Sequence, residues 1–202
     1  MGYYIRILGK NDARISIEDL RASLPTGSRF EIEAEGLDME RWSQIILRHQ
    51  NGPDIALIER NPVVPGGLGK EEIDEFAAEI EGEKPTSAAR WLHQYLPTVT
   101  VIYALQLLKG ADVDDGWNAV HAVQSRIWSR VGGILQADGE GFSNEDGYHI
   151  LWQFSEDVDG DWSMAVLGDH GKWTAFKMNL GEPAHRLAFL QGKVPSGVAP
   201  IN

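Results

Sequence analysis

The sequence contains no cysteine, which excludes thiol nucleophiles, disulfides and thiolate metal sites. It also lacks any apolar run of about 18 residues, the length that a membrane-spanning helix needs. Its first ten residues, MGYYIRILGK, have neither the apolar core nor the small-residue cleavage site of a secretory signal. These absences predict a cytoplasmic protein that has no membrane partner.

Lysine and arginine are scarce in the later part of the chain. Residues 1–64 hold 8 basic and 10 acidic side chains, whereas residues 65–202 hold 10 basic and 20 acidic ones, so most of the net charge of −12 lies there. Between Val131 and Gly171 there are nine acidic residues and no lysine or arginine. Such a surface repels phosphate backbones, which argues against nucleic acid as a partner. It suits a basic protein partner, a cation or simple solvation.

Motifs of known catalytic and cofactor sites are also missing. There is no G-x-S-x-G, and no glycine-rich dinucleotide fingerprint follows a predicted strand. The six histidines show neither H-x-H nor H-x-x-x-H spacing, so we predict no metal and no cofactor. Asp157, Asp159 and Asp161 have the spacing of the first three ligands in a calcium loop, but Gly168 stands where the bidentate glutamate belongs.

The residues that are present predict an α+β fold, beginning with a small β-α-β-β-β unit over residues 1–60. Its helix follows Ser16, a favourable N-cap residue. Its strands are predicted at Tyr3–Leu8, Arg29–Glu35, Trp42–Arg48 and Ile55–Glu59. The prolines and glycines of Arg60–Lys70 predict a linker at residues 61–70.

Residues 71–202 are predicted to form a larger unit with a mostly antiparallel sheet and flanking helices. Two helices precede a strand at Thr98–Leu108, and a long helix capped by Asp114 or Asp115 ends at Gly132-Gly133. Alternating apolar residues then predict strands, and a last helix starts at Pro183 with Leu187 on its buried face. One of these strands, Gly147–Phe154, would bury Trp152. The predicted strands after the long helix are Ile134–Ala137, Gly147–Phe154, a segment containing Trp162, Met164 and Val166, and Lys172–Leu180.

The candidate functional site is the acidic stretch from residue 138 to 146, which lies between two apolar segments. As a packed binding loop it would use Asp138, Glu140, Asn144 and Asp146, with Phe142 as a buried anchor. As a hydrolase site it would use Asp138, Glu140 and Asp146 as acid and base groups together with His149. A plain connector between strands is the third interpretation.

The charge asymmetry and the missing catalytic motifs favour the first class, a non-enzymatic binding module. Its acidic surface would face a basic protein partner, as an inhibitor or an immunity-type protein does. The hydrolase is the alternative hypothesis. The sequence predicts no oligomeric state.

Overall fold

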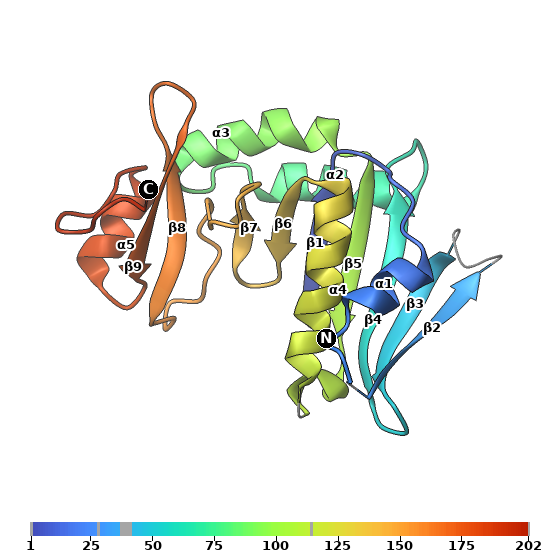
Figure 1. Cartoon of the computed structure of the whole chain (residues 1–202). Helices are drawn as coiled ribbons and strands as arrows, with labels where there is room; N and C mark the ends of the chain where they lie inside the picture. The colour runs from blue at the N-terminus through green and yellow to red at the C-terminus, as the bar shows by residue number, and fades with distance from the viewer. Residues whose placement is uncertain (1, 28, 37–41, 114, 202) are drawn as a thin grey trace. The chain divides into compact units, whose positions relative to one another are not determined.

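The computed structural model describes residues 2–27, 29–36, 42–113 and 115–201 and confirms the predicted α+β fold (Figure 1). Packing of the chain separates two units, each built from two chain segments. Unit 1 comprises residues 1–71 and 99–133, and unit 2 comprises residues 72–98 and 134–202. The linker predicted at residues 61–70 stays a prediction; β4 continues to Pro62, and the next helix begins at Leu68.

Unit 1 contains an antiparallel sheet. Its strands are β1 (Tyr4–Gly9), β2 (Phe30–Gly36), β3 (Trp42–His49), β4 (Asp54–Pro62) and β5 (Val101–Leu107). They lie in the order β2-β3-β4-β5-β1, and each neighbouring pair is antiparallel. The predicted β-α-β-β-β order of the first segment is confirmed. However, β5 comes from much later in the chain and separates β4 from β1.

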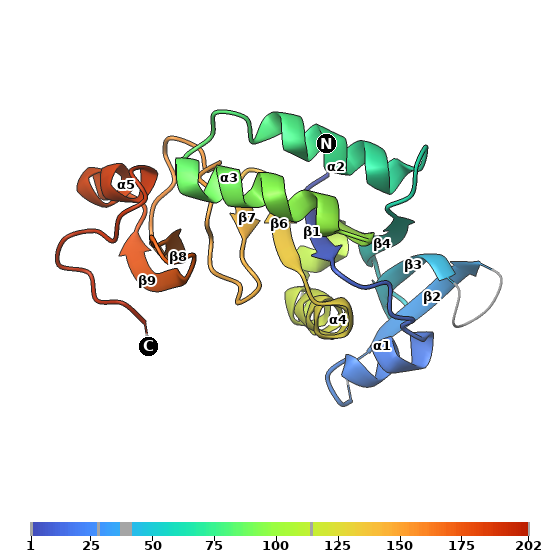
Figure 2. The same ribbon diagram turned by 90° about the horizontal axis from the view of Figure 1, so that it is seen from above.

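Two helices of unit 1, α1 (Ile17–Ser23) and α4 (Gly116–Val131), lie on one face of this sheet (Figure 2). The predicted N-cap of α1 is confirmed, because the Asp19 amide donates a hydrogen bond of 3.0 Å to Ser16 Oγ. Asp115 caps α4 without a side-chain hydrogen bond, and the alternative cap Asp114 lies outside the described residues. The predicted buried stripe of α4 has no exposed surface at any of its four positions, Val120, Val123, Ile127 and Val131.

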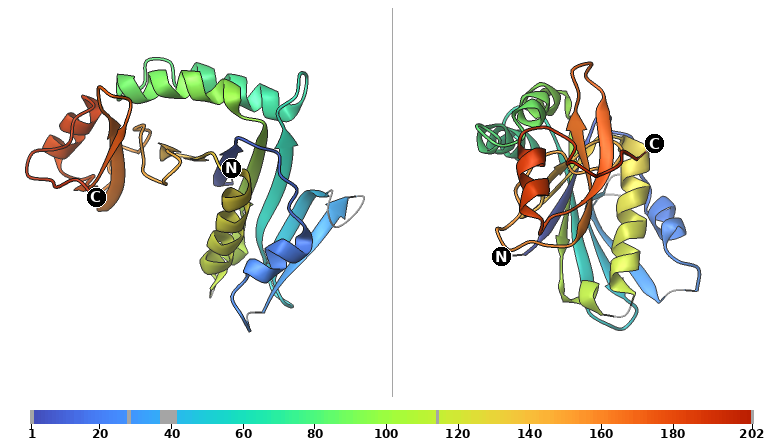
Figure 3. Two further views of the ribbon diagram at one scale, coloured as in Figure 1. Left: turned by 45° about the horizontal axis from the view of Figure 1, so that its top comes forward. Right: turned by 90° about the vertical axis from the view of Figure 1, so that its left-hand side faces the viewer.

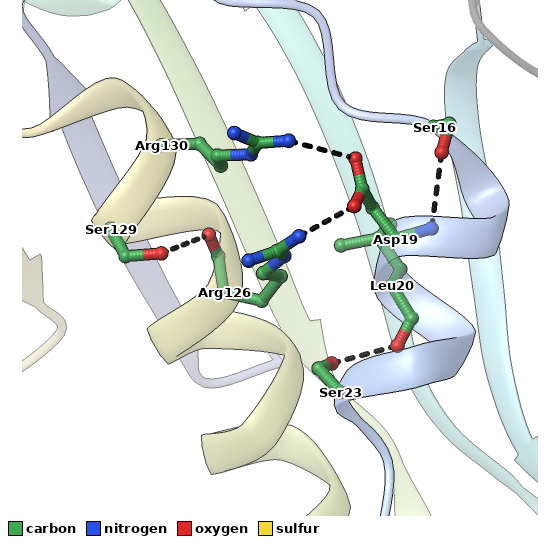
Figure 4. Close-up of polar contacts among 7 residues, drawn as sticks. All are labelled: Ser16, Asp19, Leu20, Ser23, Arg126, Ser129 and Arg130. Carbon is green, nitrogen blue, oxygen red and sulfur yellow. Dashed lines mark hydrogen bonds and ion pairs between the residues drawn. The ribbon is translucent and has the colours of Figure 1, made fainter.

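An ion cluster joins these two helices (Figure 4). The Asp19 carboxylate of α1 accepts hydrogen bonds from Arg126 and, at 3.1 Å, from Arg130 of α4. These two hydrogen bonds hold the pKa of Asp19 below its ordinary value. The contact therefore fixes α1 against α4 through charge as well as through apolar packing.

Unit 2 consists of short elements. They are α2 (Leu68–Glu79, whose first residues belong to unit 1), α3 (Thr86–Tyr95), β6 (Ile134–Ala137), β7 (Gly141–Ser143), β8 (Asp161–Leu167), β9 (Trp173–Asn179) and α5 (Pro183–Leu190). β6 pairs with β7, and β8 pairs with β9, both antiparallel. Short 3-10 helices cover Leu96–Thr98 in unit 2 and Lys109–Asp112 in unit 1. No helix among the described residues is long and apolar enough to cross a membrane.

A core lies where α5 packs against the β8–β9 hairpin (Figure 3). The predicted alternation is confirmed in β9, where Phe176 and Met178 are buried. In β8 it is confirmed only in part, because Met164 and Val166 are buried but Ala165 between them is buried too, and Trp162 is partly buried. The buried members of this core are Phe154, Met164, Val166, Phe176, Met178, Leu180 and Phe189. The prediction that Leu187 faces this core is wrong: Leu187 is 60% exposed, and Phe189 takes the inward position on this short helix.

The prediction of a strand at Gly147–Phe154 is also wrong. The backbone of this segment forms hydrogen bonds with several separate segments rather than with one neighbouring strand. The His149 amide donates to the Ser163 carbonyl, the Ile150 amide to the Phe142 carbonyl, and the Trp152 amide to the Lys84 carbonyl. Without a continuous ladder the two-residue alternation fails, because consecutive residues no longer face opposite sides of a sheet. Trp152 is consequently only partly buried, at the edge of the α5 core.

Candidate functional site

The acidic stretch folds as two tight turns on either side of β7. In the first turn, residues 138–140, the Glu140 amide donates to the Ala137 carbonyl at 3.1 Å. In the second turn, the Gly147 amide donates to the Asn144 carbonyl at 3.0 Å. The predicted acidic side chains are therefore divided, with Asp138 and Glu140 in the first turn and Asp146 in the second.

Phe142 lies between the two turns, in β7, with no exposed surface. Its ring meets Phe76 of α2 edge-on, with the ring centroids 5.5 Å apart. Its carbonyl oxygen accepts a hydrogen bond of 2.8 Å from the Ile150 amide. Phe142 therefore holds the acidic stretch in unit 2, and its side chain does not reach the surface.

Asn144 shapes the second turn from within. Its side chain is 1% exposed, and its Oδ1 accepts from the amides of Asp146 and Tyr148, at 3.1 and 3.0 Å. This arrangement imitates a backbone turn and leaves Asp146 exposed beyond it. Asn144 Nδ2 is buried and has no hydrogen-bond partner among the described residues.

Glu145 connects the second turn to α3. Tyr95, which is buried in α3, points its hydroxyl at Glu145 Oε1 at 3.4 Å. Burial, followed by the negative charge of Glu145, raises the pKa of the Tyr95 phenol well above its ordinary value. Tyr95 therefore stays neutral at physiological pH and acts as a hydrogen-bond donor.

The structure brings together Glu140 and His149, two of the four residues predicted for a hydrolase. Their side chains approach at 4.0 Å, between His149 Nε2 and Glu140 Oε2. On the other side of the ring, His149 Nδ1 lies 3.3 Å from Ser143 Oγ. Ser143 was missed from the sequence, because only the backbone bridge between residues 143 and 149 places it there.

The surroundings of His149 are apolar. Its ring meets Trp162 and Phe154 at centroid distances of 4.9 and 5.4 Å, and its side chain is 13% exposed. Burial lowers the pKa of His149 to about 4, so the imidazole is neutral at pH 7. A base of this pKa accepts a proton weakly, and Ser143, at 5% exposed, is closed to a substrate in this conformation.

Acidic side chains also line an exposed face of α2. Asp74, Glu75 and Glu79 are exposed there, and the last turn of α2 has no basic residue. Glu75 and Glu79 are one turn apart, so they repel each other, and Glu79 also lies at the negative end of the helix dipole. Glu79 Oε1 accepts one hydrogen bond of 2.9 Å from Gln153.

A cavity of about 930 Å³ opens beside the start of α5. The side chains of Asp159, Glu182 and His185 line it together with Asn179 and Ser196, and no lysine or arginine is among its described lining residues. His185 Nδ1 is buried without a hydrogen-bond partner among the residues that the structure describes. The sequence pattern indicated only a possible calcium ligand at Asp159, because α5 returns to this turn through a tertiary contact.

Within the described part of the chain, no three histidine, aspartate or glutamate side chains are grouped so that they could hold a metal ion. Comparison of the chain with protein-family models, with curated proteins and with solved structures found no match. A function therefore has to be inferred from the burial, geometry and charge of these side chains.

Proposed function

We propose that this protein is a non-enzymatic binding module whose unit 2 engages a basic protein partner through an acidic surface. The observation that carries the proposal is the distribution of charge between the units. Unit 1 holds 12 basic and 14 acidic residues, whereas unit 2 holds 6 basic and 16 acidic residues, a net charge of −10 in unit 2. An inhibitor or an immunity-type protein would use such a surface to cover a basic site on its target.

The α2 face is the first part of this surface. Repulsion between Glu75 and Glu79, and between Glu79 and the helix end, makes the free helix less stable by a few tenths of a kcal/mol for each interaction. Lysine or arginine side chains of a partner would remove this repulsion on binding. The same charges would raise the association rate by steering the partner at long range.

The second turn of the acidic stretch and the α5 cavity add further carboxylates to this surface. Glu145 and Asp146 are exposed in the turn, and the cavity presents Asp159 and Glu182. A cationic side chain fits this cavity better than a phosphate, because the two carboxylates would repel an anion. The proposed partner is therefore a basic protein, and neither nucleic acid nor a cofactor is involved. The absence of cysteine is consistent with a cytoplasmic setting.

The test compares two variants with the same change in net charge. The double variant Glu75→Gln with Glu79→Gln removes two charges from α2, and the control Glu18→Gln with Asp115→Asn removes two from unit 1. Proteins retained from a host lysate by the immobilised wild-type chain are identified, and the purified partner is then titrated against all three proteins. We expect the α2 variant to weaken binding by about 0.2–1 kcal/mol for each charge and the control to change it little.

Salt dependence provides the second measurement. The association rate with the purified partner should fall steeply with ionic strength, while the dissociation rate changes less. An association rate that is independent of salt contradicts the proposal, and so does an α2 variant that binds as tightly as the control.

A hydrolase is the second candidate, because His149 contacts both Glu140 and Ser143. If this group were catalytic, Glu140→Gln or His149→Asn would lower a measurable hydrolysis rate by a factor of about 10²–10⁴. Asp138→Asn, in the same assay, tests another of the acidic residues predicted for a hydrolase. A loss of hydrolysis with unchanged partner binding would favour the hydrolase over the binding module.

A further inference from the structure

The outer edge of β2 borders a cavity in unit 1. β2 stands first in the strand order, and β3 alone of the described strands pairs with it. The cavity, of about 560 Å³, is lined by the end of α1, by residues 24–27 and by the first residues of β2. Leu24, Pro25 and Phe30 form an apolar wall, and Arg21, Thr26 and Glu31 also line the cavity. Figure 1 shows β2 as the outermost strand of the unit 1 sheet.

One side-chain contact reveals which backbone groups face outward. Arg21 of α1 donates a hydrogen bond of 2.9 Å to the Ile32 carbonyl. In an antiparallel strand the N–H and C=O of one residue point to the same side, and this side alternates along the strand. The backbone groups of Phe30, Ile32 and Ala34 therefore point away from β3. They form a row that a further strand can pair with.

We propose that β2 accepts an extended basic segment of a protein partner as an added strand. Main-chain hydrogen bonds to the outward row would hold the segment, as in other complexes that extend a sheet at its edge. Alternate side chains of the segment would enter the cavity and pack against its apolar wall at Leu24, Pro25 and Phe30. The remaining side chains would lie over Glu31 and Glu33, so the segment should alternate apolar and basic residues.

The excess of negative charge beside β2 favours a basic partner over a second copy of the chain. Arg48 is shared between Glu33, at 3.1 Å, and Asp54, at 3.0 Å, and Glu31 lies opposite the same arginine in the register. One arginine thus faces three carboxylates. Pairing two copies through β2 would add the glutamates of a second chain to this excess, which is unfavourable, whereas lysine or arginine would neutralise it.

The inference is independent of the proposed function, because it concerns unit 1 and a different set of residues. Its probe is an acetylated, amidated heptapeptide that alternates valine and lysine, titrated into the ¹⁵N-labelled full chain. We expect amide shifts centred on β2 and the end of α1. Glu31→Gln with Glu33→Gln should weaken binding, by up to about fivefold for each charge. Arg21→Gln should tighten it, because the Ile32 carbonyl is released.

Backbone methylation of the peptide distinguishes strand addition from simple charge attraction. N-methyl groups placed on all valines block one edge of the extended peptide, and those on all lysines block the other. We expect one methylated peptide to bind like the parent and the other to lose binding. Equal binding of both, shifts confined to unit 2, equal binding of a valine–glutamate peptide, or dimerisation of the chain through β2 in sedimentation would each overturn the inference.

Discussion

Lowering the pH from 7 to 4.5 should destabilise this protein through His149. The buried imidazole, packed by Trp162 and Phe154, has a pKa of about 4 instead of the ordinary 6.5. Between these two values the unfolded chain binds a proton at His149 and the folded chain does not. With respect to His149, the free energy of unfolding is therefore at its maximum above pH 6.5 and decreases progressively as the pH falls towards 4.

The magnitude follows from the difference in pKa. One pKa unit corresponds to about 1.4 kcal/mol, so the full transition amounts to about 3 kcal/mol. Most of it, about 2–3 kcal/mol, should be lost between pH 7 and pH 4.5. This is a large share of the total stability of an ordinary domain, which is about 5–15 kcal/mol.

The assay is urea unfolding followed by tryptophan fluorescence, at several pH values, for the wild type and His149→Asn. Carboxylates titrate in the same range in both proteins, so the difference between the two pH profiles isolates His149. The variant keeps a polar group near Ser143 but has no imidazole to protonate. An NMR titration of the His149 ring gives its pKa directly.

Two results would refute this reasoning. One is that the unfolding free energy of the wild type and that of His149→Asn decrease by the same amount as the pH is lowered. The other is an NMR titration of His149 centred near 6.5, which would mean that the ring is solvated rather than enclosed by the two aromatic side chains.

Three substitutions and two controls, each measured by denaturant titration, test the packing of the fold. Phe142→Ala should cost about 3–5 kcal/mol because its ring is fully buried, whereas Leu187→Ala, at an exposed position, should change stability by less than about 0.5 kcal/mol; equal losses would contradict the assigned core. Gly133→Ala should cost more than about 3 kcal/mol, because its φ of 97° disfavours a side chain and the new Cβ would overlap a carbonyl oxygen of β1. Gly171→Ala, with a φ of 70° and open space around it, is the matched control and should cost about 1 kcal/mol. Trp152→Ala should cost about 1–3 kcal/mol, less than Phe142→Ala, since Trp152 is only partly buried; a loss as large as that of Phe142→Ala would contradict the partial burial of Trp152.

Local patterns in the sequence predicted much of the fold. The cap of α1 at Ser16 and the buried stripe of α4 depend on residues within one or two helical turns of each other. The alternation in β8 and β9 depends only on the period of an extended chain. Net charge and the absence of cysteine are likewise properties of composition.

The acidic stretch was only partly predictable. Its turn residues and the isolated Phe142 indicated a compact segment, and Phe142 is buried. The contact of His149 with Ser143 was not predictable, because single backbone bridges to separate segments replace the expected strand. The hydrophobic periodicity of the sequence cannot predict isolated backbone bridges of this kind.

Tertiary structure alone placed β5 between β4 and β1, returned α5 to the turn at Asp159, and enclosed His149 in aromatic rings. Each of these contacts joins residues that are far apart in the chain, or that lie in irregular segments. The pKa of His149 is the clearest example, since it depends on how much water the packed side chains exclude rather than on the neighbouring residues in sequence. Residue types and their spacing determine which helices and strands can form, whereas only the packing of distant segments determines which polar groups are buried.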